Sequence, residues 1–543
     1  MRRHLLLVYP RFAPNNLLNY EHSATFYLGK LAVMPPLGLL QIGAYLRRDH
    51  DVRMVDENVE PLTADDLEWA DVIALSAMHP QRGRVNEIVD EARRLGKMTI
   101  LGGPSVNICP EYYPEVNVLH VGEIGDATEE LLQFLKSDAP VPKDQLIFRT
   151  ARTTPLEDLP LPARDLAPVN QYMLQPVQFS VGCPFTCEFC DIPMIYGRVA
   201  RLKSGPRVVQ ELEQIYQLGF VGTCLFVDDN LVSNGKALKA MLVSVVEWQT
   251  ARGFPYPLTG EASINLARDK EALSLLQKAR FTHMFVGVES IDPDTLSLIS
   301  KKQNIMDPLV ESLATLGSYG LEPVLGMIFG FDTDTPDTGN HAARFIAETH
   351  VPTTYFNLLS ALPKTPLWER LEKEHRLISD SNGDLAQSAS LLSCMTTNIR
   401  FRLSSDLVTA MLRQTVRDVY SPHAVFDRFL WTIENVHTRQ RRGKPPATTR
   451  KQQWFLAKFF VVGLARVLYR AGFKASFRRD FWRFVRELIR LRRRGTIHSV
   501  VEELLIVVPL AYHLIMWGRT LLADNQASTS PPLHIQEPAH ARS

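Results

Sequence analysis

Three of the six cysteines in this 543-residue chain lie within eight residues, in the segment VGCPFTCEFCDI (181–192). Cys183, Cys187 and Cys190 have the spacing C-x3-C-x2-C, and three thiolates can bind three irons of a [4Fe–4S] cluster. Because no fourth cysteine follows, one iron would stay open to a small molecule. A structural zinc site is the alternative, but a closed zinc site needs four ligands, and no CxxC or HxxxH partner is nearby. The triplet therefore predicts an iron–sulfur site.

The other three cysteines, Cys109, Cys224 and Cys394, are isolated in the sequence. We expect each of them to be a small buried hydrophobic residue. Six cysteines in a chain of this length do not form a disulfide framework, and their clustering indicates metal binding in a reducing compartment.

The elements that must position the triplet begin near Pro176. Strand-like runs at 177–182, 223–229, 256–264, 283–289, 323–331 and 354–362 alternate with helical patterns such as 207–219 and 270–281. Six strand–helix units predict a partial parallel barrel over residues 176–369. Polar or glycine-rich stretches close its strands: VDDN (227–230), GEAS (260–263), GVES (287–290) and GMIFGF (326–331).

Residues 1–136 show the same alternation in a separate unit. Strands are expected at 4–10, 51–56, 71–77, 98–103 and 118–123, and helices at 37–48 and 84–96. This pattern predicts an α/β fold with a doubly wound, flavodoxin-like parallel sheet, which binds ligands beyond the carboxyl ends of its strands. The turns there include Ser76, Gly102 and Gly103. Residues 137–175 are rich in proline and are expected to form a linker.

The C-terminal part is expected to be helical over 370–525 and disordered over 526–543. One helical stripe in 477–494 is apolar, and arginines lie largely elsewhere. The stripe consists of Phe477, Phe481, Phe484, Val485, Leu488 and Leu491. Two interpretations stay open: a helix pair that caps the barrel, or a peripheral contact with the inner face of a membrane. The apolar run 504–517 is too short to span a bilayer.

The overall composition limits the class of protein further. Lys+Arg 60 against Asp+Glu 59 leaves a net charge of +1, so nothing global indicates a nucleic-acid partner. The N-terminal MRRHLLLVYPRF has too short an apolar run for a signal peptide and no cleavage site, so we expect a first strand there. The protein is expected to be cytoplasmic.

The cysteine spacing after a first barrel strand, with Phe189 before the third cysteine, resembles the radical S-adenosylmethionine (SAM) superfamily. This resemblance implies that SAM binds the open iron of the cluster and is cleaved to a 5′-deoxyadenosyl radical. Asp228, Asp229 and Asn230 would then face the SAM amino group, in a VDDN that replaces the family's more common Gly-Gly-Glu. The resemblance also gives Glu261 a catalytic contact with SAM or substrate. It places the ribose at Glu289 and Ser290 and the adenine at Gly326, Ile328 and Gly330.

A flavodoxin-like domain, a proline-rich linker and a radical SAM barrel together resemble the cobalamin-binding radical SAM class. PPLGLL (35–40), VDENVEPLT (55–63) and LGGP (101–104) are typical of its first domain. The resemblance implies cobalamin near Ser76, Gly102 and Gly103. The D-x-H-x-x-G motif that supplies an axial histidine is replaced by DENVEP (56–61), and His79 lies on another loop, so cobalt is expected to lack a histidine ligand. A scaffold domain without cofactor is the alternative.

CEFCDIPMIYGRVARLKS, LFVDDN and RDVYSPHAVFDRFL (417–430) resemble the subgroup that contains the bacterial hopanoid C-2 methylase. The resemblance implies methylation of an unactivated carbon in a small molecule or lipid, with an electron donor such as flavodoxin or ferredoxin. A non-methylating radical reaction (cyclisation, C–C coupling or oxidation) and a non-catalytic iron–sulfur redox protein are the alternatives.

The triplet generates a first prediction. Replacing Cys183, Cys187 and Cys190 together by alanine removes the [4Fe–4S] absorbance and SAM cleavage, because the irons lose their thiolates. Replacing Cys109, Cys224 and Cys394 in the same way spares both. Absorbance spectra and a SAM-cleavage assay after anaerobic reconstitution measure the two effects. A full cluster in the first variant would contradict the assignment.

Overall fold

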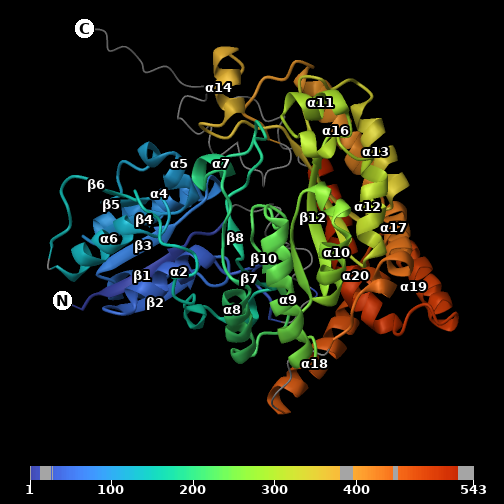
Figure 1. Cartoon of the computed structure of the whole chain (residues 1–543), viewed down its shortest axis with the longest axis horizontal. Helices are drawn as coiled ribbons and strands as arrows, with labels where there is room; N and C mark the ends of the chain where they lie inside the picture. The colour runs from blue at the N-terminus through green and yellow to red at the C-terminus, as the bar shows by residue number, and fades with distance from the viewer. Residues whose placement is uncertain are drawn as a thin grey trace, which may run out of the picture.

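The computed structural model of the chain describes residues 2–12, 26, 29–137, 139–378, 396–443 and 450–523. Two parallel sheets of six strands stand side by side, each with its own helices, and the C-terminal helices pack against the second sheet (Figure 1). The predicted α/β class, with a doubly wound sheet followed by a partial barrel and a helical C-terminal region, is confirmed. Cys394 and the tail 526–543 lie outside the described residues.

The first sheet has the strand order β2-β1-β3-β4-β5-β6. Its strands are β1 (His4–Tyr9), β2 (Asp51–Asp56), β3 (Val72–Ser76), β4 (Met98–Gly102), β5 (Val118–Val121) and β6 (Leu146–Arg149). Helices α2 (Leu37–Leu46), α3 (Ala64–Trp69), α4 (Arg82–Arg94), α5 (Pro104–Ile108) and α6 (Asp126–Lys136) connect them. In β1, Leu5 and Leu7 join the core on one face, and Leu6 and Val8 join the core on the other. Burial on both faces explains why this strand is an unbroken apolar run.

Strand β6 lies inside the segment that the sequence predicts to be a linker. It pairs in parallel with β5, Leu146 opposite Val118, and so extends the first sheet by one strand. The same segment is anchored to the second sheet by Arg164, whose buried guanidinium donates to the Pro176 carbonyl at 2.6 Å and lies 3.4 Å from Glu211. Residues 137–175 therefore contact both sheets.

The second sheet has the order β14-β13-β12-β11-β10-β7. Its strands are β7 (Leu174–Val177), β10 (Thr223–Phe226), β11 (Leu258–Glu261), β12 (Phe281–Glu289), β13 (Glu322–Phe329) and β14 (Thr353–Leu358). The helices between them are α8 (Gly205–Gln217), α9 (Gly235–Ala251), α10 (Lys270–Lys278), α11 (Pro293–Leu298), α12 (Leu309–Ser318) and α13 (Thr338–Thr349). All neighbouring strand pairs are parallel, as the six units of the sequence predict.

The first barrel strand begins and ends earlier than the predicted 177–182. After β7 the chain turns away, and β8 (Ser180–Val181) pairs in antiparallel fashion with β9 (Arg201–Leu202). The reason is the carboxylate of Asp228, which accepts hydrogen bonds from the backbone N–H groups of Phe179 and Ser180. These N–H groups are thereby removed from the ladder of the main sheet.

The C-terminal region consists of helices, as predicted. They are α14 (Pro366–Lys373), α16 (Ser405–Val419), α17 (Pro422–Asn435), α18 (Arg450–Val467), a π-helical segment (Leu468–Lys474), α19 (Arg478–Arg493) and α20 (Val500–Ala523). The apolar stripe of α19 is buried: the ring centroids of Phe484 and Phe426 lie 5.0 Å apart, and those of Phe477 and Tyr512 lie 5.6 Å apart. This stripe caps the protein core and is not free to enter a bilayer.

Helix α20 is long and apolar enough, by length and composition alone, to span a membrane, although the predicted apolar run was shorter. Its packing is that of a core helix. Most of the helix is buried against α16, α17, α18 and α19, and it carries buried Glu503 and His513.

A buried charge cluster fixes α20 to the barrel. The His437 Nε2 atom lies 2.8 Å from a carboxylate oxygen of Glu322 in β13, and its Nδ1 atom lies 3.2 Å from a carboxylate oxygen of Glu503 in α20. His283 also lies 3.7 Å from Glu322. Burial alone would lower the pKa of His437, but the hydrogen bonds to Glu322 and Glu503 outweigh it and raise the pKa to about 9. His437 is therefore charged at neutral pH.

This cluster generates a prediction on stability. The folded pKa of His437 is raised, so its contribution is complete below the unfolded pKa of 6.5 and is lost as the pH rises to about 9. The free energy of unfolding should fall by up to about 3 kcal/mol across this window. Unfolding midpoints of the wild type and of His437→Gln, measured from pH 6.5 to pH 9, test it. An equal pH dependence in the two proteins would contradict it.

Candidate functional site

The cysteine triplet lies in the loop between β8 and α7 (Ile192–Ile195). Gly182 starts this loop with φ +94°, a conformation that favours glycine, and a Cβ there would come within 3.1 Å of the Gly197 carbonyl oxygen. The Cys183 N–H donates to the same carbonyl at 3.4 Å, and the Cys190 N–H donates to the Cys187 carbonyl at 3.2 Å. The backbone thus holds the three thiols in a single compact loop.

The thiols are free and partly buried, and the structure tests how well they fit an iron–sulfur cluster. Burial raises the pKa of each of the three thiols, so the thiolates need a cation to be stable. Among the described residues, no three His, Cys, Asp or Glu side chains converge on a point where they could hold a single metal ion. Three thiols held in one loop match the number of thiolates that a [4Fe–4S] cluster with one open iron requires.

The far side of the cysteine loop is fixed by ion pairs. Glu188, between the second and third cysteines, binds Arg370 of α14 at 2.5 Å, and Arg370 also binds Asp332 at 2.7 Å. The Glu188 N–H donates to the Ile299 carbonyl at 3.1 Å. Phe189 lies beside the Lys301 ammonium, 5.8 Å from its ring centroid. These contacts fix the loop against the end of the barrel.

Shortly after β10, Asp228, Asp229 and Asn230 each accept hydrogen bonds from a neighbouring segment of the barrel end. Asp228 is buried, and both of its oxygens accept hydrogen bonds from Phe179 or Ser180. Asp229 accepts from the Gly182 N–H at 2.7 Å. Asn230 accepts from the Ser263 N–H at 3.2 Å. The structure therefore gives Asp228 a role in the fold, and the contacts of all three with SAM stay a prediction.

Glu261 ends β11, and its side chain is accessible. The protein that surrounds the Glu261 carboxyl on its other sides reduces its hydration, and this and the nearby carboxylates of Asp229 and Asp228 raise its pKa to about 7. Within the part of the chain that the structure describes, no hydrogen bond or ion pair engages its side-chain oxygens, whereas Glu289 pairs with Lys301 at 2.5 Å. Glu261 is thus an acid positioned to meet a cationic ligand.

The remaining predicted SAM contacts lie at the ends of β12 and β13. Glu289 has φ +63°, and the Ser290 hydroxyl accepts from the Asp292 N–H at 3.2 Å. A Cβ at Gly326 would come 2.9 Å from the Phe285 ring, and one at Gly330 would collide with the Phe401 ring. Ile328 is buried in a neighbouring apolar cluster. Both glycines make room for a phenylalanine, and contact with adenine stays a prediction.

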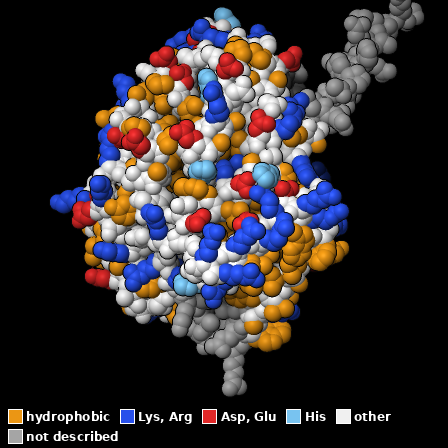
Figure 2. All heavy atoms as spheres, turned by 90° about the vertical axis from the view of Figure 1, so that its right-hand side faces the viewer, with side chains coloured by type: hydrophobic (Ala, Val, Ile, Leu, Met, Phe, Trp, Pro, Cys, Tyr) orange, Lys and Arg blue, Asp and Glu red, His pale blue; other side chains and the backbone are white. Residues whose placement is uncertain are grey.

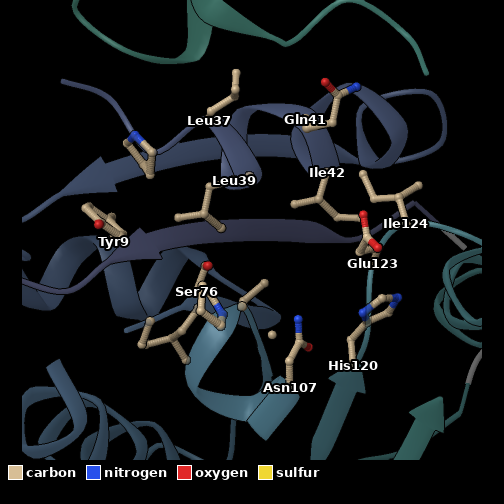
Figure 3. Close-up of a pocket in the computed structure, with 18 of the residues that line it drawn as sticks. Tyr9, Leu37, Leu39, Gln41, Ile42, Ser76, Asn107, His120, Glu123 and Ile124 are labelled. Carbon is tan, nitrogen blue, oxygen red and sulfur yellow. The ribbon is translucent and has the colours of Figure 1, made fainter. Parts of the chain in front are cut away.

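A cavity of about 420 Å³ opens between the two sheets (Figure 3). The predicted residues Ser76, Gly102 and Gly103 line it at the ends of β3 and β4. Gly103 has φ +99°, and a Cβ there would lie 2.5 Å from the Ser76 hydroxyl. Other elements of the first domain, α2, α5, β5 and the turn after β5, add Leu37, Leu39, Gln41, Ile42, Asn107, His120, Glu123 and Ile124. The barrel side adds Gln178, Val181, Tyr196 and Val227. The floor is mostly apolar with amide, hydroxyl and imidazole groups at its edge.

The sequence analysis missed His120, Asn107, Glu123 and Gln41 as lining residues. Only the packing of β5, α5 and α2 brings them to one cavity, although a polar residue at a strand end was a usable signal for His120. The His120 Nε2 lies 2.9 Å from the Thr128 hydroxyl, and burial lowers its pKa. His79 does not line the cavity: its Nδ1 lies 2.8 Å from Ser105, and burial lowers its pKa to about 4.

The cavity fits the cobalamin that the sequence predicts. A corrin is a large apolar ring with amide side chains, and this cavity offers an apolar floor with hydrogen-bonding groups at its edge. Glu123 is bound to Arg201 of β9 at 2.5 Å, so the cavity wall is continuous with the strand that supports the cysteine segment. The two candidate sites are therefore neighbours.

Three family models match successive parts of the chain. The model of the B12 binding domain matches residues 31–132, that of the radical SAM superfamily matches 177–346, and that of a domain of unknown function matches 365–527.

Two relatives cover most of the chain. The hopanoid C-2 methylase of Rhodopseudomonas palustris (strain TIE-1) is 38% identical over 537 residues, 99% of this chain and 98% of the relative. An uncharacterized methyltransferase of Synechocystis sp. is 32% identical over 477 residues, 88% of this chain and 86% of the relative.

Two solved structures share the fold. The cobalamin-dependent SAM radical enzyme OxsB, with aqua-cobalamin and SAM bound, has a TM-score of 0.60 at 15% identity and covers 97% of this chain and 81% of its own. The radical SAM methyltransferase TsrM from Kitasatospora setae, with cobalamin and a [4Fe–4S] cluster bound, has a TM-score of 0.57 at 16% identity and covers 92% of this chain and 100% of its own.

The cavity generates a prediction about cofactor loading. A valine at Gly103 would clash with Ser76 and the Ala77 backbone, so Gly103→Val should lose bound cobalamin and keep its iron. Cobalt and iron contents of the reconstituted proteins measure this.

Gly96→Val is the matched control, because Gly96 also has a positive φ (+66°) but no atom lies within 4 Å of its Cβ position. The control should bind cobalamin normally if it folds. Equal cobalt in the two variants would show that cobalamin binds elsewhere.

Proposed function

The chain belongs to the family of cobalamin-dependent radical SAM methylases that includes the hopanoid C-2 methylase, and on this premise we propose that it methylates an unactivated ring carbon of a hopanoid or similar polycyclic lipid. It is a methyltransferase that uses a [4Fe–4S] cluster, SAM and cobalamin. The proposal on the substrate is supported by 38% identity over 99% of this chain. The two relatives that cover most of the chain are a methylase and an uncharacterized methyltransferase, which favours methylation over the non-methylating alternatives.

We assign cluster binding to Cys183, Cys187 and Cys190 and cobalamin binding to the cavity wall that contains Ser76, Gly102 and Gly103. Once bound, the two groups supply an electron for SAM cleavage and a methyl group for transfer. The chain itself must hold the reacting groups close together and keep water away from a radical. One observation carries this proposal: the cavity at the ends of β3 and β4 shares a wall with the cysteine loop.

That shared wall consists of Val181 and Tyr196, which line the cavity on either side of the cysteine loop. Gly197, next to Tyr196, accepts the N–H of Cys183, so the loop and the wall form one unit. A substrate carbon between the cavity and the barrel end would reach both reacting groups. Such an arrangement converts separate encounters into one oriented complex.

We propose that the Glu261 carboxylate binds the cationic part of SAM or orients the substrate at the end of β11. Its pKa of about 7 leaves it about half ionised at neutral pH, so a nearby cation would favour the charged form. Glu289 and Ser290 are assigned to the ribose, and Gly326, Ile328 and Gly330 to the adenine. Asp228, Asp229 and Asn230, which follow β10, are assigned to the SAM amino group.

Three further assignments complete the proposal. The domain division is cobalamin-binding 1–136, linker 137–175, barrel 176–369 and helical region 370–525, with the linker also supplying β6. The electron donor is a small redox protein such as flavodoxin or ferredoxin. The enzyme acts in the cytoplasm, at the inner face of a membrane.

The function is tested with anaerobically reconstituted protein, a reductant, a hopene and SAM labelled with deuterium in its methyl group. We expect a product that has gained one labelled methyl group, together with 5′-deoxyadenosine and S-adenosylhomocysteine. Mass spectrometry of the lipid extract and the aqueous phase measures all three.

Glu261→Gln is the informative variant: it should retain iron and cobalt but give little product, since the carboxylate is lost and the shape is kept. Formation of both S-adenosylhomocysteine and 5′-deoxyadenosine without a labelled lipid would contradict the proposed substrate. SAM cleavage with no methyl transfer to any lipid would favour the non-methylating alternative. No SAM cleavage would favour a redox protein.

A further inference from the structure

The C-terminal helices expose large apolar side chains along one continuous segment. Trp454 and Val461 of α18 are 65% and 69% exposed, and Tyr469 and Phe473 of the π-helical segment are 60% and 66% exposed. Trp454, Lys458 and Val461 are spaced four and three residues apart, so they lie on one helix face. Trp482 of α19 continues the patch, with its ring 6.1 Å from that of Phe473.

We call these residues, with Lys458, Lys474 and the exposed arginines of α19, the basic aromatic surface. From Trp454 to Arg494 the sequence has twelve lysines and arginines and two acidic residues, whereas the whole chain carries a net charge of only +1. Both acidic residues lie beside a cationic or titratable partner: Asp480 is 3.6 Å from His423, and Glu487 is 2.5 Å from Arg490. The surface is therefore strongly positive.

The packing explains why this surface faces outward. Helix α18 packs on α20, and the apolar stripe of α19 is turned into the core, so the exposed residues are those that the fold leaves uncovered. Figure 2 shows hydrophobic side chains gathered beside a dense group of Lys and Arg toward the lower right of the face that carries α17 and α19. Clusters of exposed apolar side chains on a soluble protein mark interaction sites.

We propose that the basic aromatic surface docks this protein on an anionic lipid bilayer, which assigns a function to the helical domain. Tryptophan, tyrosine and phenylalanine between lysines and arginines match the border between headgroups and acyl chains, and the positive charge matches acidic headgroups. The apolar part of the contact lies on α18, the π-helical segment and Trp482, and α19 adds its exposed arginines, whereas the buried apolar stripe of α19 takes no part.

The position of the surface argues against an acidic electron donor as its partner. Figure 1 shows α18 at the opposite end of the molecule from α7, which follows the cysteine loop. A donor must approach the cysteines, whereas a bilayer contact has no such requirement. Docking therefore attaches the enzyme to the membrane by the end remote from the radical site, and it does not depend on the proposed substrate.

Sedimentation of the reconstituted full-length protein with vesicles tests the proposal. We expect binding to phosphatidylcholine vesicles that contain phosphatidylglycerol, little binding to phosphatidylcholine alone, and release by high salt, which screens exposed charges. Arg479→Glu with Arg486→Glu should lower partitioning at least about tenfold. Trp454→Ser with Phe473→Ser should also lower it, because the apolar insertion is lost.

Matched control variants carry equal changes on other faces. Lys236→Glu with Lys278→Glu alters two exposed lysines of the barrel helices, and Leu95→Ser with Ile147→Ser alters two exposed apolar residues of the first domain. Both should bind vesicles like the wild type, and iron and cobalt contents confirm folding of every variant. Equal binding to both vesicle types, no binding to either, loss of binding in the controls, or a preference for RNA over anionic vesicles would each overturn the proposal.

Discussion

One buried carboxylate sets the geometry of the catalytic end of this protein. Asp228, at the end of β10, accepts the N–H groups of Phe179 and Ser180 and the hydroxyl of Ser180. Those bonds bend the chain out of the first barrel strand and direct it into the cysteine loop. A buried carboxylate is costly unless hydrogen bonds satisfy it, and here the satisfied bonds determine where the three thiols lie. The cavity wall at Val181 and the antiparallel pair β8–β9 follow from the same bend.

Local patterns explain which elements the sequence could predict. The unbroken apolar run of β1 predicts burial on two faces, and the apolar spacing in α19 predicts one buried stripe. Both elements could be predicted because each pattern lies within a few consecutive residues. The cysteine triplet is equally local. The end of the first barrel strand was missed because it depends on Asp228, 48 residues away from Ser180. Strand β6 was missed because it is short, half exposed and flanked by prolines, so it lacks the pattern of a buried strand.

The same distinction applies to the site. Ser76, Gly102 and Gly103 could be placed from the rule that ligands bind beyond strand ends. His120, Asn107 and Gln41 reach that cavity from three separate elements, and no sequence spacing relates them. Asp228 shows the converse case: it stands at a position predicted to bind a ligand, and its carboxylate accepts hydrogen bonds from backbone N–H groups. Charge and position in a motif name candidates, and hydrogen-bond partners decide between ligand and scaffold.

Strand β6 has a consequence for how the protein is made. The ribosome releases the first five strands before Leu146, so β5 stays an open edge until the chain has entered the proline-rich segment and β6 has been made. All four residues of β5 are buried in the finished sheet, and an uncovered edge of this kind can pair with another chain. A gene fragment that ends at residue 136 would therefore yield a first domain that lacks β6 and is prone to aggregate. Recombination that exchanges this domain must include β6.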